Sequence, residues 1–249
     1  MQKPANFRDI GGIPGADGRT IRTGLLLRAA QPIALSESDH AALAAYNITN
    51  IVDFRRPWEV RLAPNDNIAG AAYTNLDVLA GMPWAEATLE EWLDNVTIED
   101  VDKSLNDNYL YFVSAASARR IFADFLRICI DADGAVLFHC HAGKDRTGMA
   151  AAILLKLLGT SNEDVFADYM RTLDDIKTRL SGVIDGYRRR GLDKDKLAAL
   201  EVVYGIKREY LDASFAAANA QFGDFAGYIT NGLGINDSEI ATLQKKYLM

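Results

Sequence analysis

The segment from residue 135 to 158 constrains the fold of this chain more than any other. It starts with the apolar residues AVLF, continues through HCHAGKDRTG, and ends in TGMAAAILLKLL, which is apolar on nearly every face. The first part predicts a buried strand over 135–138, and the last predicts a buried helix over 147–158 that ends at Gly159. A strand joined to a buried helix by a glycine-containing loop is typical of an α/β fold.

The first third of the chain repeats this alternation of strands and helices. Residues 25–27 form an apolar run, and residues 48–54 (ITNIVDF) form another. Between them Ser36 and Asp39 have the spacing of a helix N-terminus, followed by helical spacing of Ala and Leu over 40–46. Alternation of this kind predicts a central, mostly parallel sheet flanked by helices.

The rest of the chain is mainly helical. Residues 115–130 predict an amphipathic helix, and Asn236 with Glu239 forms a capping box for the last one. Residues 81–114 contain Trp84 and Trp92, and they predict one or two short helices outside the alternation. We interpret this stretch as a lid or insertion, although packing is the commoner use of such tryptophans. With no repeat or low-complexity linker, residues 1–249 are expected to form one domain.

Composition excludes several classes of function. The chain is 49% hydrophobic and 24% charged, which is ordinary for a globular protein, and its net charge of −7 argues against broad nucleic-acid binding. Its two cysteines, Cys129 and Cys140, suit a reducing compartment. The three histidines show no metal-ligand spacing, so no metal is expected.

The start of the chain and the absence of long apolar runs bear on its location. No run approaches the roughly 20 apolar residues that a membrane span needs. The first residues, MQKPANFRDIGG, lack the apolar core of a signal peptide. A cytoplasmic location is therefore expected, and export by a route without such a signal stays open.

The loop between the central strand and helix has the chemistry of a phosphoryl-transfer site. The N-terminus of the buried helix points toward it, so unpaired N–H groups and the helix dipole favour an anion. The same influences favour a thiolate on Cys140, which follows the strand. Arg146 can hold two phosphoryl oxygens at once. A nucleotide-binding P-loop is excluded because no glycine lies five residues before Gly143, and Asp145 stands where Ser or Thr is needed.

These residues resemble the signature loop of the bacterial cysteine-dependent protein tyrosine phosphatases. His139-Cys140, five intervening residues and Arg146-Thr147-Gly148 carry the resemblance, and Lys144-Asp145 is similar to the mycobacterial subgroup with dual activity toward tyrosine and lipid phosphates. The segment NFRDIGG (6–12) and VDFR (52–55) with Glu59 also resemble this family. The resemblance implies a phosphatase that needs no metal or cofactor and acts on phosphotyrosine, possible further substrates being phosphoserine, phosphothreonine or phosphoinositides.

The resemblance also implies roles for individual residues. Cys140 would accept the phosphate and Arg146 would hold its oxygens in both steps. Thr147 would assist release of the thiolate, and His139 would order the loop. The other positions expected to bind phosphate or substrate are His141, Ala142, Gly143 and Lys144.

Lys144 and Asp145 have two interpretations each. Lys144 is either a solvated loop charge or a second cation for an acidic substrate, which favours phosphoinositides. A carboxylate at Asp145 opposes anion binding, so it either has a structural role or takes part in proton transfer.

The proton donor for the leaving group is left open among three sources. Asp53 ends a predicted strand, where ligands collect in α/β sheets, but it could instead pair with Arg55 or Arg56. Asp145 and an acidic residue within 94–107 are the others.

The remaining candidates are supporting ones. Arg8 and Asp9 are expected to support the loop, the alternative being a surface ion pair. Cys129 is expected in the core rather than as a redox partner of Cys140. The functional class that competes with an enzyme is a phosphate-binding module whose chemistry is lost, against which the intact Cys140 and Arg146 argue.

Overall fold

The structure is a computed structural model that describes residues 4–82, 93 and 95–249. Its strands are β1 (Arg8–Asp9), β2 (Leu26–Ala29), β3 (Ile48–Asp53), β4 (Ala72–Asn75) and β5 (Ala135–His139). The helices of the first half are η1 (Ala16–Gly18), α1 (Glu37–Ala44), α2 (Pro57–Leu62), α4 (Ile98–Ser114) and α5 (Ala116–Asp131). The second half contains α6 (Asp145–Leu157), α7 (Asn162–Met170), α8 (Thr172–Arg189), α9 (Lys194–Tyr204), α10 (Arg208–Phe222), α11 (Phe225–Gly227), the π-helical η2 (Tyr228–Gly232) and α12 (Asp237–Tyr247).

The strands form a sheet in the order β1-β2-β5-β3-β4. Only β1 is antiparallel to its neighbour, so the predicted mostly parallel sheet is confirmed. Since β2, β5 and β3 run in the same direction, their carboxyl ends lie at one edge, where His139 is paired with Ala29 on one side and Asp53 on the other. Ligands collect at this edge in open α/β sheets.

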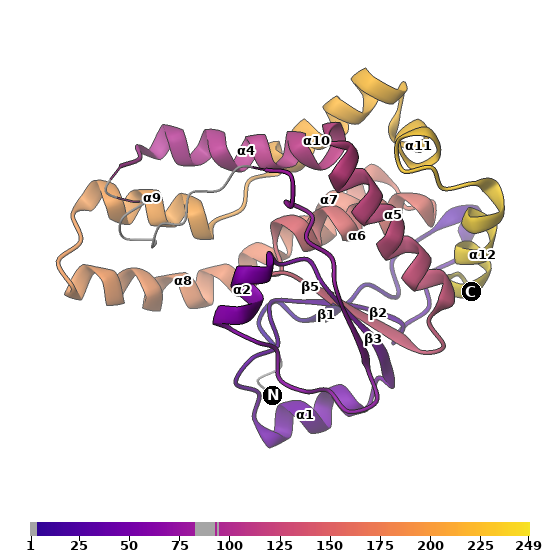
Figure 1. Cartoon of the computed structure of the whole chain (residues 1–249), viewed down its shortest axis with the longest axis horizontal. Helices are drawn as coiled ribbons and strands as arrows, with labels where there is room; N and C mark the ends of the chain where they lie inside the picture. Colours follow the sequence, from indigo (N-terminus) through magenta and orange to yellow (C-terminus); the bar gives the residue numbers. More distant parts are fainter. Residues whose placement is uncertain (1–3, 83–92, 94) are drawn as a thin grey trace.

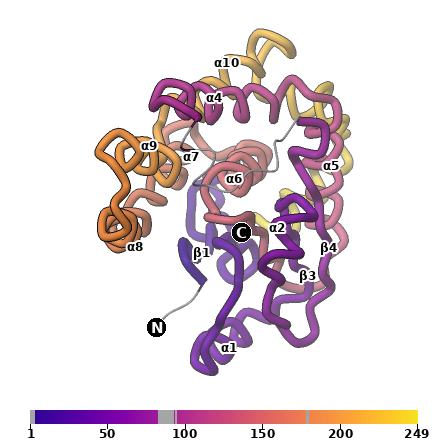
Figure 2. Tube along the Cα trace, turned by 60° about the vertical axis from the view of Figure 1, so that its left-hand side comes forward, coloured from indigo at the N-terminus to yellow at the C-terminus, as the bar shows by residue number. Residues whose placement is uncertain are grey.

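Alternation along the strands divides the sheet into two apolar faces. Leu27, Ile51 and Leu137 pack on the side of α1, whereas Val52, Val136 and Phe138 belong to the larger core beneath α5 and α6. Figures 1 and 2 show the sheet between these layers, with α8 and α9 extending away from it beside α4.

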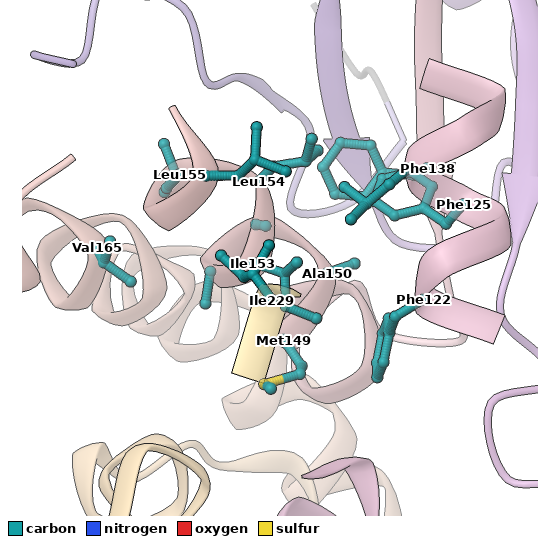
Figure 3. Packing of buried hydrophobic residues seen from close by; sticks show 14 of the residues in the cluster. Phe122, Phe125, Phe138, Met149, Ala150, Ile153, Leu154, Leu155, Val165 and Ile229 are labelled. Atoms are coloured by element: carbon teal, nitrogen blue, oxygen red, sulfur yellow. The ribbon is translucent and has the colours of Figure 1, made fainter. Parts of the chain in front are cut away.

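Helix α6 lies in the middle of the larger core. Every residue from Thr147 to Leu155 is buried, which confirms the helix that the apolar sequence predicts. Figure 3 shows Ile153 and Leu154 of α6 near Phe138 of β5, and the Phe138 ring lies 5.1 Å from the ring of Phe125 in α5. The strand and helix that flank the loop are therefore held rigidly by apolar contacts.

The two helix starts that were predicted from capping residues three positions apart are confirmed. Ser36 with Asp39 caps α1, and Asn236 with Glu239 caps α12, each by a complete capping box. The expectation of short helices over 81–114 is wrong for the described part of that stretch. Residues 98–114 form one 17-residue helix, α4, and its apolar side joins the main core. Trp84 and Trp92 lie outside the described residues, so their role in a lid stays a prediction.

In the parts of the chain that the structure describes, no helix is both long and apolar enough to cross a membrane.

Candidate active site

The loop from Cys140 to Lys144 connects β5 to α6 at the carboxyl edge of the sheet. Cys140 follows the strand directly and is 2% exposed. Lys144 is the N-cap residue of α6, and its carbonyl accepts the first helical hydrogen bond from Gly148 N at 2.7 Å. Gly143 has φ of +68° and lies so close to Ala29 that an added Cβ would be 2.4 Å from its carbonyl carbon. The loop therefore requires glycine here, because both the conformation and the space exclude a side chain.

Neighbouring segments hold the carbonyl groups of this loop. His141 O accepts from Gln31 N at 3.1 Å, and Ala142 O accepts from Asn6 Nδ2 at 3.3 Å. Gly143 O accepts from Asn6 Nδ2 at 2.8 Å and from Arg28 at 3.0 Å.

In a planar trans peptide the N–H of the next residue points away from the carbonyl. The N–H groups of residues 142, 143 and 144 are thus turned to the other side of the loop. Nothing among the described residues accepts a hydrogen bond from them, and successive N–H groups of this kind are suited to an anion.

A buried ion network lies behind the loop. Asp168 of α7 binds Arg8 Nε at 2.7 Å through one oxygen and Arg28 at 2.6 Å through the other. Arg8 also donates to Asn6 Oδ1, so both donors to Gly143 O are connected through this carboxylate. Burial works to raise the pKa of Asp168, but the two guanidinium groups more than offset it and lower the pKa. Asp168 thus orders the loop from outside it.

Arg28 and Asp168 were not predicted from the sequence as part of the site. The sequence did contain a signal for each of them. Arg28 is a charged residue within a buried strand, and Asp168 lies on the apolar side of a helix, next to Val165 and Tyr169. Buried charges of this kind are paired. Arg8 was predicted to support the loop and does contact this network. Asp9 instead accepts from the N–H groups of Gly11 and Gly24, so it holds a turn in the N-terminal segment.

Arg146 lies above the end of β3. It donates to both oxygens of Glu59 in α2, at 2.6 and 3.0 Å, and to Phe54 O at 3.3 Å. Burial lowers the pKa of Arg146, but the nearby Cys140 and Glu59 more than offset this, so the pKa is raised. Glu59 fixes the direction of the guanidinium and leaves it close to Cys140.

Asp53 forms an ion pair rather than facing open space. Arg55 donates to its two oxygens at 2.7 to 3.1 Å, and Tyr73 donates to Oδ2 at 2.9 Å. Burial works to raise the pKa of Asp53, yet the hydrogen bonds from Arg55 and the nearby His139 lower it. The sequence left two interpretations of Asp53, a proton donor or an ion-pair partner of Arg55 or Arg56. These contacts agree with pairing to Arg55.

This ion pair also sets the protonation of His139. Arg55 donates to Asn65 Oδ1 at 2.7 Å, which turns the Asn65 amide nitrogen toward His139 Nε2 at 2.9 Å. Nε2 must then accept, so the proton lies on Nδ1, which donates to Cys140 O at 3.0 Å. Burial lowers the pKa of His139 to about 4, with Asp53 and the bond to Cys140 opposing it. A neutral imidazole thus orders the chain at Cys140.

We expect folding stability to fall as the pH is lowered below the pKa of an unfolded histidine. The folded pKa of His139 is about 4 against 6.5 for the free side chain, so the unfolded chain binds the extra proton in this interval. The free energy of unfolding should decrease by about 2 kcal/mol between roughly pH 6.5 and pH 5. Urea unfolding at several pH values measures this, with the His139→Gln variant as the control that should show a smaller slope. Equal slopes in both proteins would contradict the assignment.

Lys144 and Asp145 are both engaged by other parts of the fold. Lys144 Nζ donates to Val203 O and Gly205 O, each at 2.7 Å, at the carboxyl end of α9, and it lies 3.4 Å from Asp145. Asp145 Oδ1 accepts from Tyr109 of α4 at 3.0 Å. Lys144 is 5% exposed, so it is not a solvated loop charge.

The hydroxyl of Thr147 has no such partner. Its Oγ1 is buried without a hydrogen bond to any described residue. A buried hydroxyl without a partner costs free energy, and functional sites are where such groups persist. The position, one residue after Arg146 in the first turn of α6, suits a contact with a group bound in the loop.

Both cysteines are free thiols, and Cys129 is fully buried in the core. Burial raises the pKa of Cys129 far above its ordinary value. Cys129 lies near the carboxyl end of α5, which leads into β5, whereas Cys140 follows the opposite end of that strand. The strand is about 16 Å long, and a disulfide needs Cα atoms within about 7 Å. This separation favours the core role for Cys129. In the described residues, no cluster of three or more His, Cys, Asp or Glu side chains could hold a metal ion.

Comparison with known proteins agrees with this geometry. The sequence model of the tyrosine phosphatase family matches residues 1–249. The chain belongs to the tyrosine phosphatase family. A protein of Cupriavidus necator named as a tyrosine-protein phosphatase is 31% identical to it, over 98% of this chain and 86% of that protein. The triple specificity protein phosphatase PtpB of Mycobacterium tuberculosis is 26% identical, over 94% of this chain and 93% of that protein.

A solved structure also matches at low similarity. The crystal structure of TpbA from P. aeruginosa is 16% identical, covering 88% of this chain and 99% of that chain, with a TM-score of 0.32. This likeness is too weak for a comparison of the two sites. The family resemblance stated from the signature loop is confirmed by the family match.

Proposed function

We propose that this phosphatase hydrolyses phosphotyrosine through a phosphocysteine intermediate on Cys140. The observation that carries the proposal is the orientation of Arg146, whose guanidinium donates to the two Glu59 oxygens at 2.6 and 3.0 Å and interacts electrostatically with Cys140. A nucleophile, a set of N–H groups without an acceptor and a planar cation are then available on one loop. These are the elements that phosphoryl transfer to sulfur requires.

Each residue has a role in two steps. The thiolate of Cys140 attacks phosphorus and the bond to the tyrosine oxygen breaks. Arg146 and the N–H groups of residues 142–144 stabilise the charge on the phosphoryl oxygens. Water then hydrolyses the thiophosphate, and the hydroxyl of Thr147 donates to the departing sulfur. Inorganic phosphate and sulfate present the same oxygens, so both should compete for the loop.

The test of this proposal is phosphate release by the wild-type protein from a phosphotyrosine peptide. Phosphoserine and phosphothreonine peptides and phosphoinositide vesicles are compared at equal concentration. We expect turnover of phosphotyrosine, and acid quenching during turnover should leave phosphate on Cys140, located by fragmentation of the tryptic peptide 128–144, which also contains Cys129. Binding of the phosphopeptide without phosphate release would instead identify a catalytically silent binding module.

The phosphoinositide alternative depended on Lys144 as a free second cation. Its ammonium group donates to two carbonyls of the α9 end in this structure, so no contact favours this alternative. Activity toward phosphoinositides stays a prediction from the sequence, and the vesicle arm of the same experiment measures it.

A further inference from the structure

The proposed reaction needs a proton donor, and Asp53 and Asp145, the two candidates named from the sequence, are engaged elsewhere. A phenolate is a poor leaving group, so a carboxylic acid close to the leaving oxygen accelerates the step by about 10²- to 10⁴-fold. Asp53 is fully buried and bound by Arg55. Asp145 accepts from Tyr109 and lies beside Lys144.

Within the described part of 94–107, the aspartates are also bound to other groups. Asp100 completes the capping box of α4 with Thr97. Asp102 accepts from Lys207 and Tyr210, and Asp107 pairs with Lys103 at 2.7 Å. None of these contacts involves the loop around Cys140.

Asp77 stands at the same sheet edge as Cys140. In the register of the parallel strands, His139 is paired with Asp53, and Asp53 with Asn75. Cys140 lies one residue beyond this level and Asp77 two residues beyond it. Two strand spacings, about 10 Å in total, separate the ends of β5 and β4. A phosphoryl group, its leaving oxygen and an aspartate side chain in a row have a length of this order.

Arg146 lies between these two strand ends. Its guanidinium donates to Phe54 O, the residue that follows β3, and β3 is the strand between β5 and β4. A phosphoryl group bound by this guanidinium and attached to Cys140 would extend from the end of β5 toward that of β4. Its leaving oxygen, opposite the sulfur in an in-line displacement, then points to the β4 side.

The surroundings of Asp77 differ from those of the other aspartates. The carboxyl is half-buried, Leu79 N donates to its Oδ1 at 2.9 Å, and no described Lys or Arg forms an ion pair with it. Burial raises the pKa of Asp77, and the nearby Glu59 adds to the rise. The Leu79 N–H and the charges of Arg56 and Arg146 act in the opposite direction and are smaller. A half-buried acid with a raised pKa keeps its proton to higher pH than an ordinary aspartate.

The segment after Asp77 is fastened in place. Arg56 donates to Met82 O through both terminal nitrogens, at 3.1 and 3.2 Å. At Gly81 an added Cβ would lie 2.5 Å from the Tyr111 hydroxyl, so this glycine is packed against α4. The turn that carries Asp77 is therefore held at both ends, by β4 and by these contacts.

On the basis of the proposed function, we propose that Asp77 is the catalytic proton donor of this phosphatase. As the thiolate of Cys140 bonds to phosphorus, the bond between phosphorus and the tyrosine oxygen breaks and its electron pair goes to that oxygen. The oxygen takes the proton of the Asp77 carboxyl, giving tyrosine, phosphocysteine and the Asp77 carboxylate. In the second step this carboxylate accepts a proton from the attacking water, which regenerates the acid and the thiolate.

The test compares two substrates that differ in their need for a proton. The Asp77→Asn variant should lose about 100-fold or more in kcat/KM for a phosphotyrosine peptide, but about 10-fold or less for p-nitrophenyl phosphate, whose nitrophenolate leaves readily without a proton. In the wild type, activity falls at high pH as Asp77 ionises, and the variant should lose this limb of the pH profile. In a Cys140→Ser background, Asp77→Asn should leave phosphopeptide binding intact.

Two variants serve as comparisons. Asp107→Asn removes only an exposed ion pair with Lys103 and should behave as the wild type. Asp145→Asn tests the competing donor. The assignment is overturned if Asp77→Asn lowers kcat/KM equally for both substrates, or if the variant keeps the fall in activity at high pH. It is also overturned if Asp145→Asn shows the loss that is selective for the phosphotyrosine peptide. Absence of turnover in the wild type, or its survival in Cys140→Ser, would refute the proposed function itself and not this assignment alone.

Discussion

Replacing Cys140 with serine should reduce turnover of a phosphotyrosine peptide by at least about 10⁴-fold, because a serine hydroxyl is a much weaker nucleophile than a thiolate. Steady-state phosphate release and acid-quench trapping measure the loss. Binding should persist, because the loop N–H groups and Arg146 do not depend on the sulfur. Isothermal titration with the same peptide should therefore still give binding by the serine variant.

The second cysteine provides a matched control for this substitution. Cys129 lies in the core near the carboxyl end of α5, and Cys129→Ala should keep activity per folded molecule even if stability falls. Phosphate located on Cys129 itself by fragmentation of the tryptic peptide 128–144, or turnover that survives Cys140→Ser, is incompatible with the proposed intermediate.

Replacing Asp168 with asparagine should decrease the free energy of unfolding by about 3 to 5 kcal/mol, because it leaves two buried guanidinium groups without their shared carboxylate. The Arg28 side chain is 0% exposed, and that of Arg8 is 8% exposed. Urea unfolding measures the change. Activity of the folded fraction should also fall, since Arg28 and Asn6 hold Gly143 O.

Glu163→Ala is the control on the same helix. Glu163 is exposed in the first turn of α7, so its removal should change stability by less than about 0.5 kcal/mol. A similarly small effect of Asp168→Asn would mean that the network does not stabilise the fold. Unchanged kcat/KM in folded Asp168→Asn would show that it does not order the loop.

Both sets of variants concern one small region of positive charge in an acidic protein. The net charge of −7 is a property of the whole surface, whereas Arg146, the loop N–H groups and the N-terminus of α6 act over a few ångströms. A local cation in a buried site is screened far less than surface charge. This accounts for an anion site in a chain whose composition disfavours polyanion binding.

Features encoded by neighbouring residues could be predicted from the sequence. Cys140 and Arg146 lie six positions apart on a single strand–loop–helix unit, so their proximity follows from the chain itself. The capping boxes at Ser36 and Asn236 involve residues three positions apart, and both were predicted and are present. The buried strand and helix around the loop follow from their apolar composition.

Features that depend on contacts between distant segments needed the tertiary structure. Arg8 and Asp168 are 160 positions apart, and only the packing of α7 behind the sheet joins them. The sequence could place Asp53 at a strand end, but it could not show that Arg55 binds this carboxylate. It also did not predict β4, the strand after which Asp77 lies. The sequence alone determined the fold class and predicted the nucleophile and the phosphate-binding loop, because apolar patterning and neighbouring residues encode them. Which carboxylates are ion-paired and which one keeps a proton was decided by burial and neighbouring charge, which arise only when the strands and helices pack together.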